Sequence, residues 1–153
     1  MKNENEDHAY QVTVEWTGES TGKMSSPGIE EHLHVATPPE FPGGVEGVWS
    51  PEHLYTASVA SCFMTSFTAV ARFSKFDYLE LKIESDGIMS KRENKYVMSK
   101  VILKPVLTIS RDKSEKKALR LLEKAEEICL ITRSINAEVQ MEARIHVLEE
   151  KVT

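Results

Sequence analysis

Alternation of apolar and polar residues predicts five β-strands along the chain, because every second side chain of a strand lies on the same face. The segments with this pattern are residues 10–16, 32–35, 79–89, 96–109 and 139–147. Polar residues 91–94 predict a hairpin turn, and the Gly- and Ser-rich residues 17–28 predict a loop. Pro105 indicates an edge strand or a bulge, because proline cannot donate a ladder hydrogen bond.

Two segments have the spacing of helices. Ser50 suits an N-cap, Pro51 suits the first turn and Glu52 suits the positive end of the helix dipole, so a helix is predicted from here to about Phe73. Residues 112–129 carry apolar side chains at intervals of three and four, which form one face of a second helix. The order β-β-α-β-β-α-β predicts an α+β fold in which the two helices pack on antiparallel sheets.

The composition is that of a soluble globular protein. The 153 residues are 41% hydrophobic and 28% charged, and they predict a single domain over residues 1–153 with flexible polar residues 1–8. The net charge of −5 argues against nucleic-acid binding, which needs a basic surface. The N-terminus lacks the apolar core of a signal peptide, so we expect a cytoplasmic protein.

One uncharged stretch is long enough to raise the question of a membrane span. Residues 54–71 contain no charged side chain, but they include six serines and threonines. That many hydroxyl groups favour a helix buried in protein, and we expect no membrane partner.

Two cysteines, Cys62 and Cys129, are the candidates for chemistry. They are too few for a disulfide-rich scaffold, and neither has a histidine at zinc-ligand spacing, so they do not predict a zinc site. His32 and His34 share one face of a short strand but lack further ligands. Each thiol could act as a small buried hydrophobe, or the two could meet, because both helices are expected to cover the same sheet.

Motifs around the cysteines favour chemistry over packing. Residues 50–63 read SPEHLYTASVASCF, which resembles the segment NPEQLFAAGYAACF of the OsmC/Ohr family of osmotically induced and organic-hydroperoxide-resistance proteins. Residues 125–134 resemble the second-cysteine segment of that family, and residues 39–44 resemble the Gly-Gly stretch that precedes its Pro-Glu motif. The resemblance covers about residues 10–148.

This resemblance implies an OsmC-like fold and an intertwined homodimer with two active sites at the subunit interface. It also implies a hydroperoxide reductase in which Cys62 attacks an organic hydroperoxide and becomes a sulfenic acid. Cys129 would then form a disulfide with Cys62, and a dithiol or a lipoyl protein would reduce it. The resemblance therefore implies no metal, flavin, haem or other bound cofactor. Glu52 would belong to the site, although acidic residues at helix starts are also common capping features.

One residue that the resemblance leads us to expect is missing. The reductases of the family usually carry an arginine in a turn after the first strand, where it pairs with the motif glutamate and stabilises the thiolate. Ser20 stands at that position, and the chain has no arginine before Arg72. Cys62 lies too far into its helix for the helix dipole to lower its pKa. We therefore expect Lys23 to replace the arginine in part, with Arg133 as another candidate, although lysine lacks the planar fork of arginine.

The spacing of Glu52 and Cys62 adds a geometric expectation. Ten residues of helix span about 15 Å, so Glu52 and Cys62 of one chain cannot touch. If Glu52 serves a Cys62, we expect it to be the Cys62 of the other subunit. Trp16, Trp49 and Tyr55 either line a pocket for an organic peroxide or act as core aromatics. The competing hypothesis is a non-catalytic dimer of the same fold that binds a small apolar ligand, and the missing arginine favours it.

Overall fold

The computed structural model describes residues 7–149, so most of residues 1–8, for which flexibility was predicted, lie outside the described part. The chain divides into two compact units, one ending at Pro51 and one beginning at Glu52. Each unit is described by itself, and the single-domain organisation stays a prediction.

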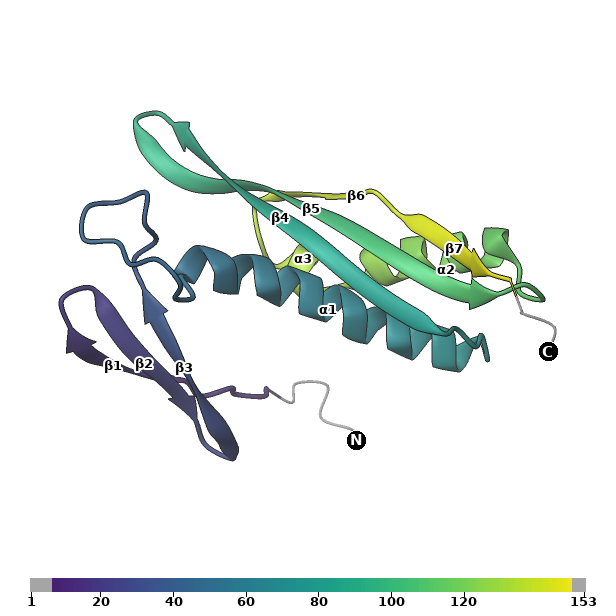
Figure 1. Ribbon diagram of the computed structural model, residues 1–153, viewed down its shortest axis with the longest axis horizontal. Coiled ribbons are helices and arrows are strands. Elements are labelled where there is room, and N and C mark those ends of the chain that lie inside the picture. The colour runs from purple at the N-terminus through teal and green to yellow at the C-terminus, as the bar shows by residue number, and fades with distance from the viewer. Residues whose placement is uncertain (1–6, 150–153) are drawn as a thin grey trace. The chain divides into compact units, whose positions relative to one another are not determined.

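The first unit is a small antiparallel sheet followed by a loop (Figure 1). Its strands, in sheet order, are β1 (Thr13–Gly18), β2 (Thr21–Ser26) and β3 (Ile29–Ala36). The loop predicted over residues 17–28 is wrong, because β2 forms there. Met24 of β2 pairs with Val14 on one side and with Leu33 on the other. Pairing on both sides therefore outweighs the weak strand propensity of the Gly- and Ser-rich segment.

The second unit contains all the helices of the described residues. Its elements are α1 (Pro51–Phe73), β4 (Glu80–Arg92), β5 (Lys95–Ser110), α2 (Glu115–Ile128), α3 (Leu130–Arg133), β6 (Glu138–Met141) and β7 (Arg144–Leu148). Helix α1 has the predicted bounds. Helix α2 begins later than predicted because Ser114 caps it, its Oγ accepting the N–H of Lys117 at 3.1 Å. The predicted hairpin turn between β4 and β5 is formed by Glu93 and Asn94, both with positive φ.

Strand β5 is the centre of the second sheet, and the long β4–β5 hairpin is visible in Figure 1. Strand β5 pairs antiparallel with β4. It also pairs parallel with β6 along residues 100–103 and parallel with β7 along residues 106–110. The single final strand predicted over residues 139–147 is thus broken in two, and its pairing is parallel. Pro105 lies in this central strand and not at an edge, at the gap between the two parallel ladders, where a missing N–H is tolerated.

The core lies between this sheet and the two longer helices. Its fully buried residues from β5 alternate along the strand and are Val101, Leu103, Leu107 and Ile109. Helix α1 contributes a stripe at four-residue spacing, Val59, Phe63, Phe67 and Ala71. Helix α2 contributes Ala118, Leu121, Leu122 and Ala125. Burying one of the larger of these side chains contributes about 1.5–3 kcal/mol of stabilising free energy. Burial therefore determines which face of each helix packs on the sheet.

The start of α1 packs closely on β4 at a glycine. A Cβ atom on Gly87 would collide with Oγ1 of Thr56 and lie 3.0 Å from Cε of Met98. Thr56 in turn donates its hydroxyl to the carbonyl oxygen of Glu52 at 3.0 Å. Glycine at position 87 therefore permits the first turns of α1 to lie against the sheet.

Helix α1 is also the one helix of the described residues that is long and apolar enough, by length and composition, to cross a membrane. A core helix of a soluble protein passes the same test. Val59, Phe63, Phe67 and Ala71 of this helix are buried in the core, but only 22% of its apolar window is buried within the single chain.

Candidate functional site

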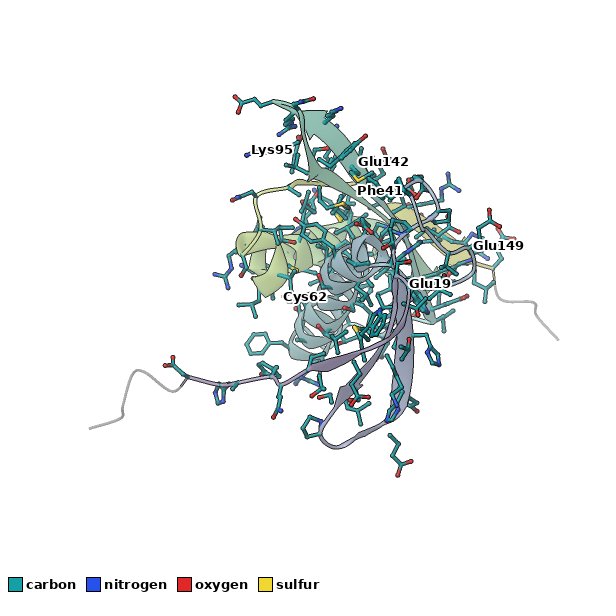
Figure 2. The ribbon with its side chains drawn as sticks, turned by 90° about the vertical axis from the view of Figure 1, so that its left-hand side faces the viewer. Glu19, Phe41, Cys62, Lys95, Glu142 and Glu149 are labelled. Atoms are coloured by element: carbon teal, nitrogen blue, oxygen red, sulfur yellow. The ribbon has the colours of Figure 1, made fainter. Side chains whose placement is uncertain are left out.

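Folding brings Cys62 and Cys129 together. Cys62 is half-buried in the third turn of α1, which Figure 2 shows nearly end-on with Cys62 labelled. Cys129 is buried at the junction of α2 and α3, where its N–H donates to the carbonyl oxygen of Glu126 at 3.3 Å. Both cysteines are free, and they lie near enough for each thiol to shift the pKa of the other.

Hydrogen-bond donors surround the sulfur of Cys62. Partial burial is the largest single influence and raises the pKa of Cys62. The pKa is lowered by the N–H of Ile131, the thiol of Cys129, the N–H of Leu130 and the hydroxyl of Ser66, in that order. These four hydrogen bonds outweigh burial, so the pKa of Cys62 lies below its ordinary value. All four donors are neutral groups, and two of them are backbone N–H groups of α3.

The pKa of Cys129 moves in the opposite direction. Burial raises it most, the hydroxyl and the N–H of Thr132 lower it, and the neighbouring Cys62 raises it further. Cys62 is therefore the first of the two thiols to ionise. Arg133, the next residue along α3, is exposed. A low-pKa thiol beside a protonated one is the arrangement that a nucleophile and a resolving cysteine require.

Glu52 lies in the first turn of α1, as the sequence predicted. Its Oε2 atom is buried and has no hydrogen-bond partner among the described residues. Buried carboxylate oxygens nearly always accept a hydrogen bond. Oε2 of Glu52 is therefore still able to accept one from a donor group. The continuous helix separates Glu52 from Cys62 of the same chain by about 15 Å. The two residues therefore do not meet within one chain.

Ser20, at the position of the expected arginine, anchors a loop. Its hydroxyl donates to the carbonyl oxygen of Gly43 at 2.5 Å. The loop is tight, because a Cβ atom on Gly44 would collide with the backbone of Pro38. The N–H of Val45 also donates to the carbonyl oxygen of Thr37 at 2.9 Å. Ser20 thus has a structural role in the first unit.

Lys23 is paired across the sheet of the first unit. Its Nζ lies 4.0 Å from Oε2 of Glu15, which is its partner in the β1–β2 register. The lysine side chain is 36% exposed. The action of Lys23 on Cys62 stays a prediction.

The other candidates from the sequence lie on the surface or against the core. His32 and His34 are exposed on β3, and the part of the chain that the structure describes contains no group of three or more metal-ligating side chains. Trp16 and Trp49 are exposed, at 76% and 50%. Tyr55 is half-buried and packs against the core.

Sequence reasoning missed several residues around the thiols. Ser66 had a signal, because residues four apart on a helix share a face and Ser66 follows Cys62 by four. Leu130 and Ile131 act through backbone N–H groups, which leave no mark in side-chain chemistry.

Comparison with known proteins identifies the family. A family model described as OsmC-like protein matches residues 44–144, and the chain belongs to this OsmC-like family. A curated relative, the uncharacterized protein YmaD of Bacillus subtilis strain 168, is 27% identical over 146 residues. That match spans 91% of this chain and 95% of YmaD.

Solved structures have the same fold. An OsmC-like protein of unknown function from Vibrio cholerae has a TM-score of 0.79 at 21% identity, covering 90% of this chain and 99% of that one. The organic hydroperoxide resistance protein OsmC from Legionella pneumophila has a TM-score of 0.73 at 22% identity, covering 94% and 100%. OhrB of Bacillus subtilis, an organic hydroperoxide resistance protein, has a TM-score of 0.67 at 21% identity, covering 90% and 98%. These likenesses confirm the α+β, OsmC-like fold class.

Proposed function

We propose that this protein is a thiol-dependent hydroperoxide reductase that acts on organic hydroperoxides through Cys62 and Cys129. The observation that carries the proposal is the proximity of two free thiols whose pKa values are shifted in opposite directions. Proteins of the OsmC/Ohr family are typically dimeric and act on hydroperoxides, and two of the compared structures are named organic hydroperoxide resistance proteins.

The reaction begins at the sulfur of Cys62. Its thiolate attacks one oxygen of the hydroperoxide, so that an S–O bond forms while the O–O bond breaks. The departing alkoxide takes up a proton and leaves as the alcohol, and Cys62 becomes a sulfenic acid. The neighbouring Cys129 then attacks the Cys62 sulfur, which forms the disulfide and releases water. A dithiol or a lipoyl group carried by a protein returns two electrons by thiol–disulfide exchange. These steps use no metal or organic cofactor.

Glu52 is the third proposed site residue, and its role requires a homodimer. Because about 15 Å of helix separates Glu52 from its own Cys62, the carboxylate would serve the thiol of the second subunit. The buried, unpartnered Oε2 atom supports a role beyond capping, since a capping carboxylate is normally solvated or hydrogen-bonded.

The alternative is a non-catalytic OsmC-like dimer that binds a small apolar ligand. Ser20 favours this alternative, because the position of the family arginine is occupied by a residue that anchors a loop. A cytoplasmic location, where thiols stay reduced, suits either function.

Peroxide consumption separates the two functions. With tert-butyl hydroperoxide and dithiothreitol, the wild-type protein is expected to consume peroxide catalytically and Cys62→Ser is expected to lose this activity. Cys129→Ser should accumulate a Cys62 sulfenic acid that dimedone traps, while the wild-type protein should show a Cys62–Cys129 disulfide by non-reducing mass spectrometry. Equal peroxide consumption by the wild-type protein and Cys62→Ser would contradict the enzymatic function.

A further inference from the structure

A cavity lies in the second unit between the last turns of α1 and the middle of α2. Its volume is about 580 Å³, which is in the range typical of small-molecule sites. Neither cysteine lines it, and Phe73 follows Cys62 by eleven residues, about 16 Å along the helix axis. The side chains used below come from both helices, and they are Ala69, Val70, Arg72, Phe73, Leu121 and Lys124.

The wall of the cavity is largely apolar. Leu121 is buried in the core and Val70 packs against it, so these two side chains are held in place. Phe73 is the largest apolar side chain of the wall, yet it is 91% exposed in the single chain. An alkyl chain lying in the cavity would remove apolar surface of Phe73 from water, and burial of this kind is the main favourable contribution to the binding of such ligands.

Both charged side chains of the wall are cations. Arg72 lies in the last turn of α1, Lys124 lies on α2, and among the described residues no carboxylate lines the cavity. Lys124 is 3.8 Å from Glu127, but 58% of its side chain is exposed, so this surface pair is weak and leaves Nζ accessible. The cavity is therefore locally positive in a chain whose net charge is −5.

Helix stability explains only one of these two cations. Arg72 complements the negative end of the α1 dipole, as basic residues in a last turn commonly do. Lys124 lies before the last turn of α2, where this effect has faded. The convergence of the two cations on one apolar cavity therefore has no explanation in the helices alone.

We propose that this cavity binds a small amphipathic anion, an alkyl chain that ends in a carboxylate. The chain would lie against Val70, Phe73 and Leu121, with the carboxylate between Arg72 and Lys124. A guanidinium group can donate two parallel hydrogen bonds to a carboxylate, and an ammonium group adds a compact charge. The site goes beyond the proposed function, because none of its residues takes part in the thiol chemistry.

The test is isothermal titration calorimetry of the full chain with decanoate, decanol and decyltrimethylammonium, each below its micelle concentration. The three compounds share a ten-carbon chain and differ in the charge of the head group. Decanoate is expected to bind one molecule per chain, roughly tenfold more tightly than decanol, because two surface ion pairs add to the apolar burial. Decyltrimethylammonium should bind most weakly, since its charge repels both cations.

Substitutions separate the two parts of the site. Arg72→Gln and Lys124→Gln should each weaken decanoate binding roughly twofold to fivefold and leave decanol binding unchanged. Phe73→Ala should weaken the binding of both compounds. Arg120→Gln is the matched control, because Arg120 is an exposed cation of α2 that does not line the cavity.

Three results would overturn the site. The first is equal affinity for the three compounds, or no saturable binding of decanoate. The second is a loss of affinity in Cys62→Ser, which would place the ligand at the thiols. The third concerns a second copy of the chain as the occupant: if decanoate does not bind, and Phe73→Ala turns a dimer into a monomer in sedimentation velocity, the cavity is a subunit contact.

Discussion

The thiols of Cys62 and Cys129 lie near enough to shift each other's pKa, although 67 positions separate the two residues in the sequence. The pKa of Cys129 is raised mainly by burial, and the pKa of Cys62 is lowered mainly by the N–H of Ile131. The influence of each thiol on the other acts in the same two directions, so the two side chains are chemically unequal. A pair of this kind can divide a reaction between a nucleophile and a resolving thiol without a metal or a cofactor.

The first prediction concerns which thiol reacts as the pH rises. Only the thiolate is alkylated, and the pKa of Cys62 is lowered while that of Cys129 is raised. Alkylation of Cys62 should therefore rise with pH first, reach its plateau below the pH range of an ordinary thiol, and precede that of Cys129. Peptide mass spectrometry across a pH series measures both curves. In Cys129→Ala, which removes the donor thiol and puts no donor in its place, the Cys62 curve should move to higher pH. Simultaneous titration of both thiols would be the contrary result.

A second prediction tests Lys23 as the replacement for the missing arginine. If its ammonium group stabilises the thiolate, Lys23→Ala raises the pKa of Cys62 and slows its alkylation below that pKa. Lys82→Ala is a suitable control, because Lys82 is an exposed lysine paired with Glu84 on the same strand. No change in the Cys62 curve would remove Lys23 from the site.

A third prediction concerns the close approach of α1 to β4. Gly87→Ala places a methyl group against Oγ1 of Thr56, and overpacking of this kind typically costs about 1–3 kcal/mol of unfolding free energy. Thr56→Ala removes the colliding oxygen, so the double variant should recover part of the loss. Urea unfolding of the two single variants and the double variant gives the coupling energy. Strict additivity of the two changes would show that the helix does not press on Gly87.

A fourth prediction compares two phenylalanines on one helix. Phe63 is fully buried beside Cys62, and its replacement by alanine should lower the unfolding free energy by about 3–5 kcal/mol. Phe73, at the end of the same helix, is 91% exposed in the single chain, and Phe73→Ala should have a much smaller effect. Equal losses in urea unfolding would mean that the core is not organised around the α1 stripe.

The sequence predicted those elements whose periodicity is long and uninterrupted. The alternation along β5 predicts that strand with nearly its observed bounds, and the start signals Ser50, Pro51 and Glu52 predict the beginning of α1. β2 was not predicted, because Gly22 and Ser25 have weak strand propensity. The strand is stabilised by pairing with β1 on one side and β3 on the other. The division of the final strand into β6 and β7 was not predicted for a different reason. The alternation from Val139 to Val147 continues across the break, so the pattern itself contains no sign of it.

The candidate site was also predicted only in part from the sequence. Both cysteines could be placed on helical faces toward one sheet, because apolar spacing reports which face is buried. The donors to Cys62 could not be predicted in full, since the N–H groups of Leu130 and Ile131 become available through the start of a four-residue helix, α3. Such a short element has too few residues to produce a periodic signal.

The bond from Ser20 to Gly43 limits substitution at position 20 by the arginine that the family resemblance leads us to expect. Ser20→Arg would introduce a guanidinium group, but it would also remove the hydroxyl that donates to the carbonyl oxygen of Gly43 and anchors the loop. Gly44, which tolerates no side chain against Pro38, keeps that loop from adjusting by small shifts. We therefore expect an arginine at position 20 to need a compensating change in the loop after β3, so that the turn and the loop vary together and not one residue alone.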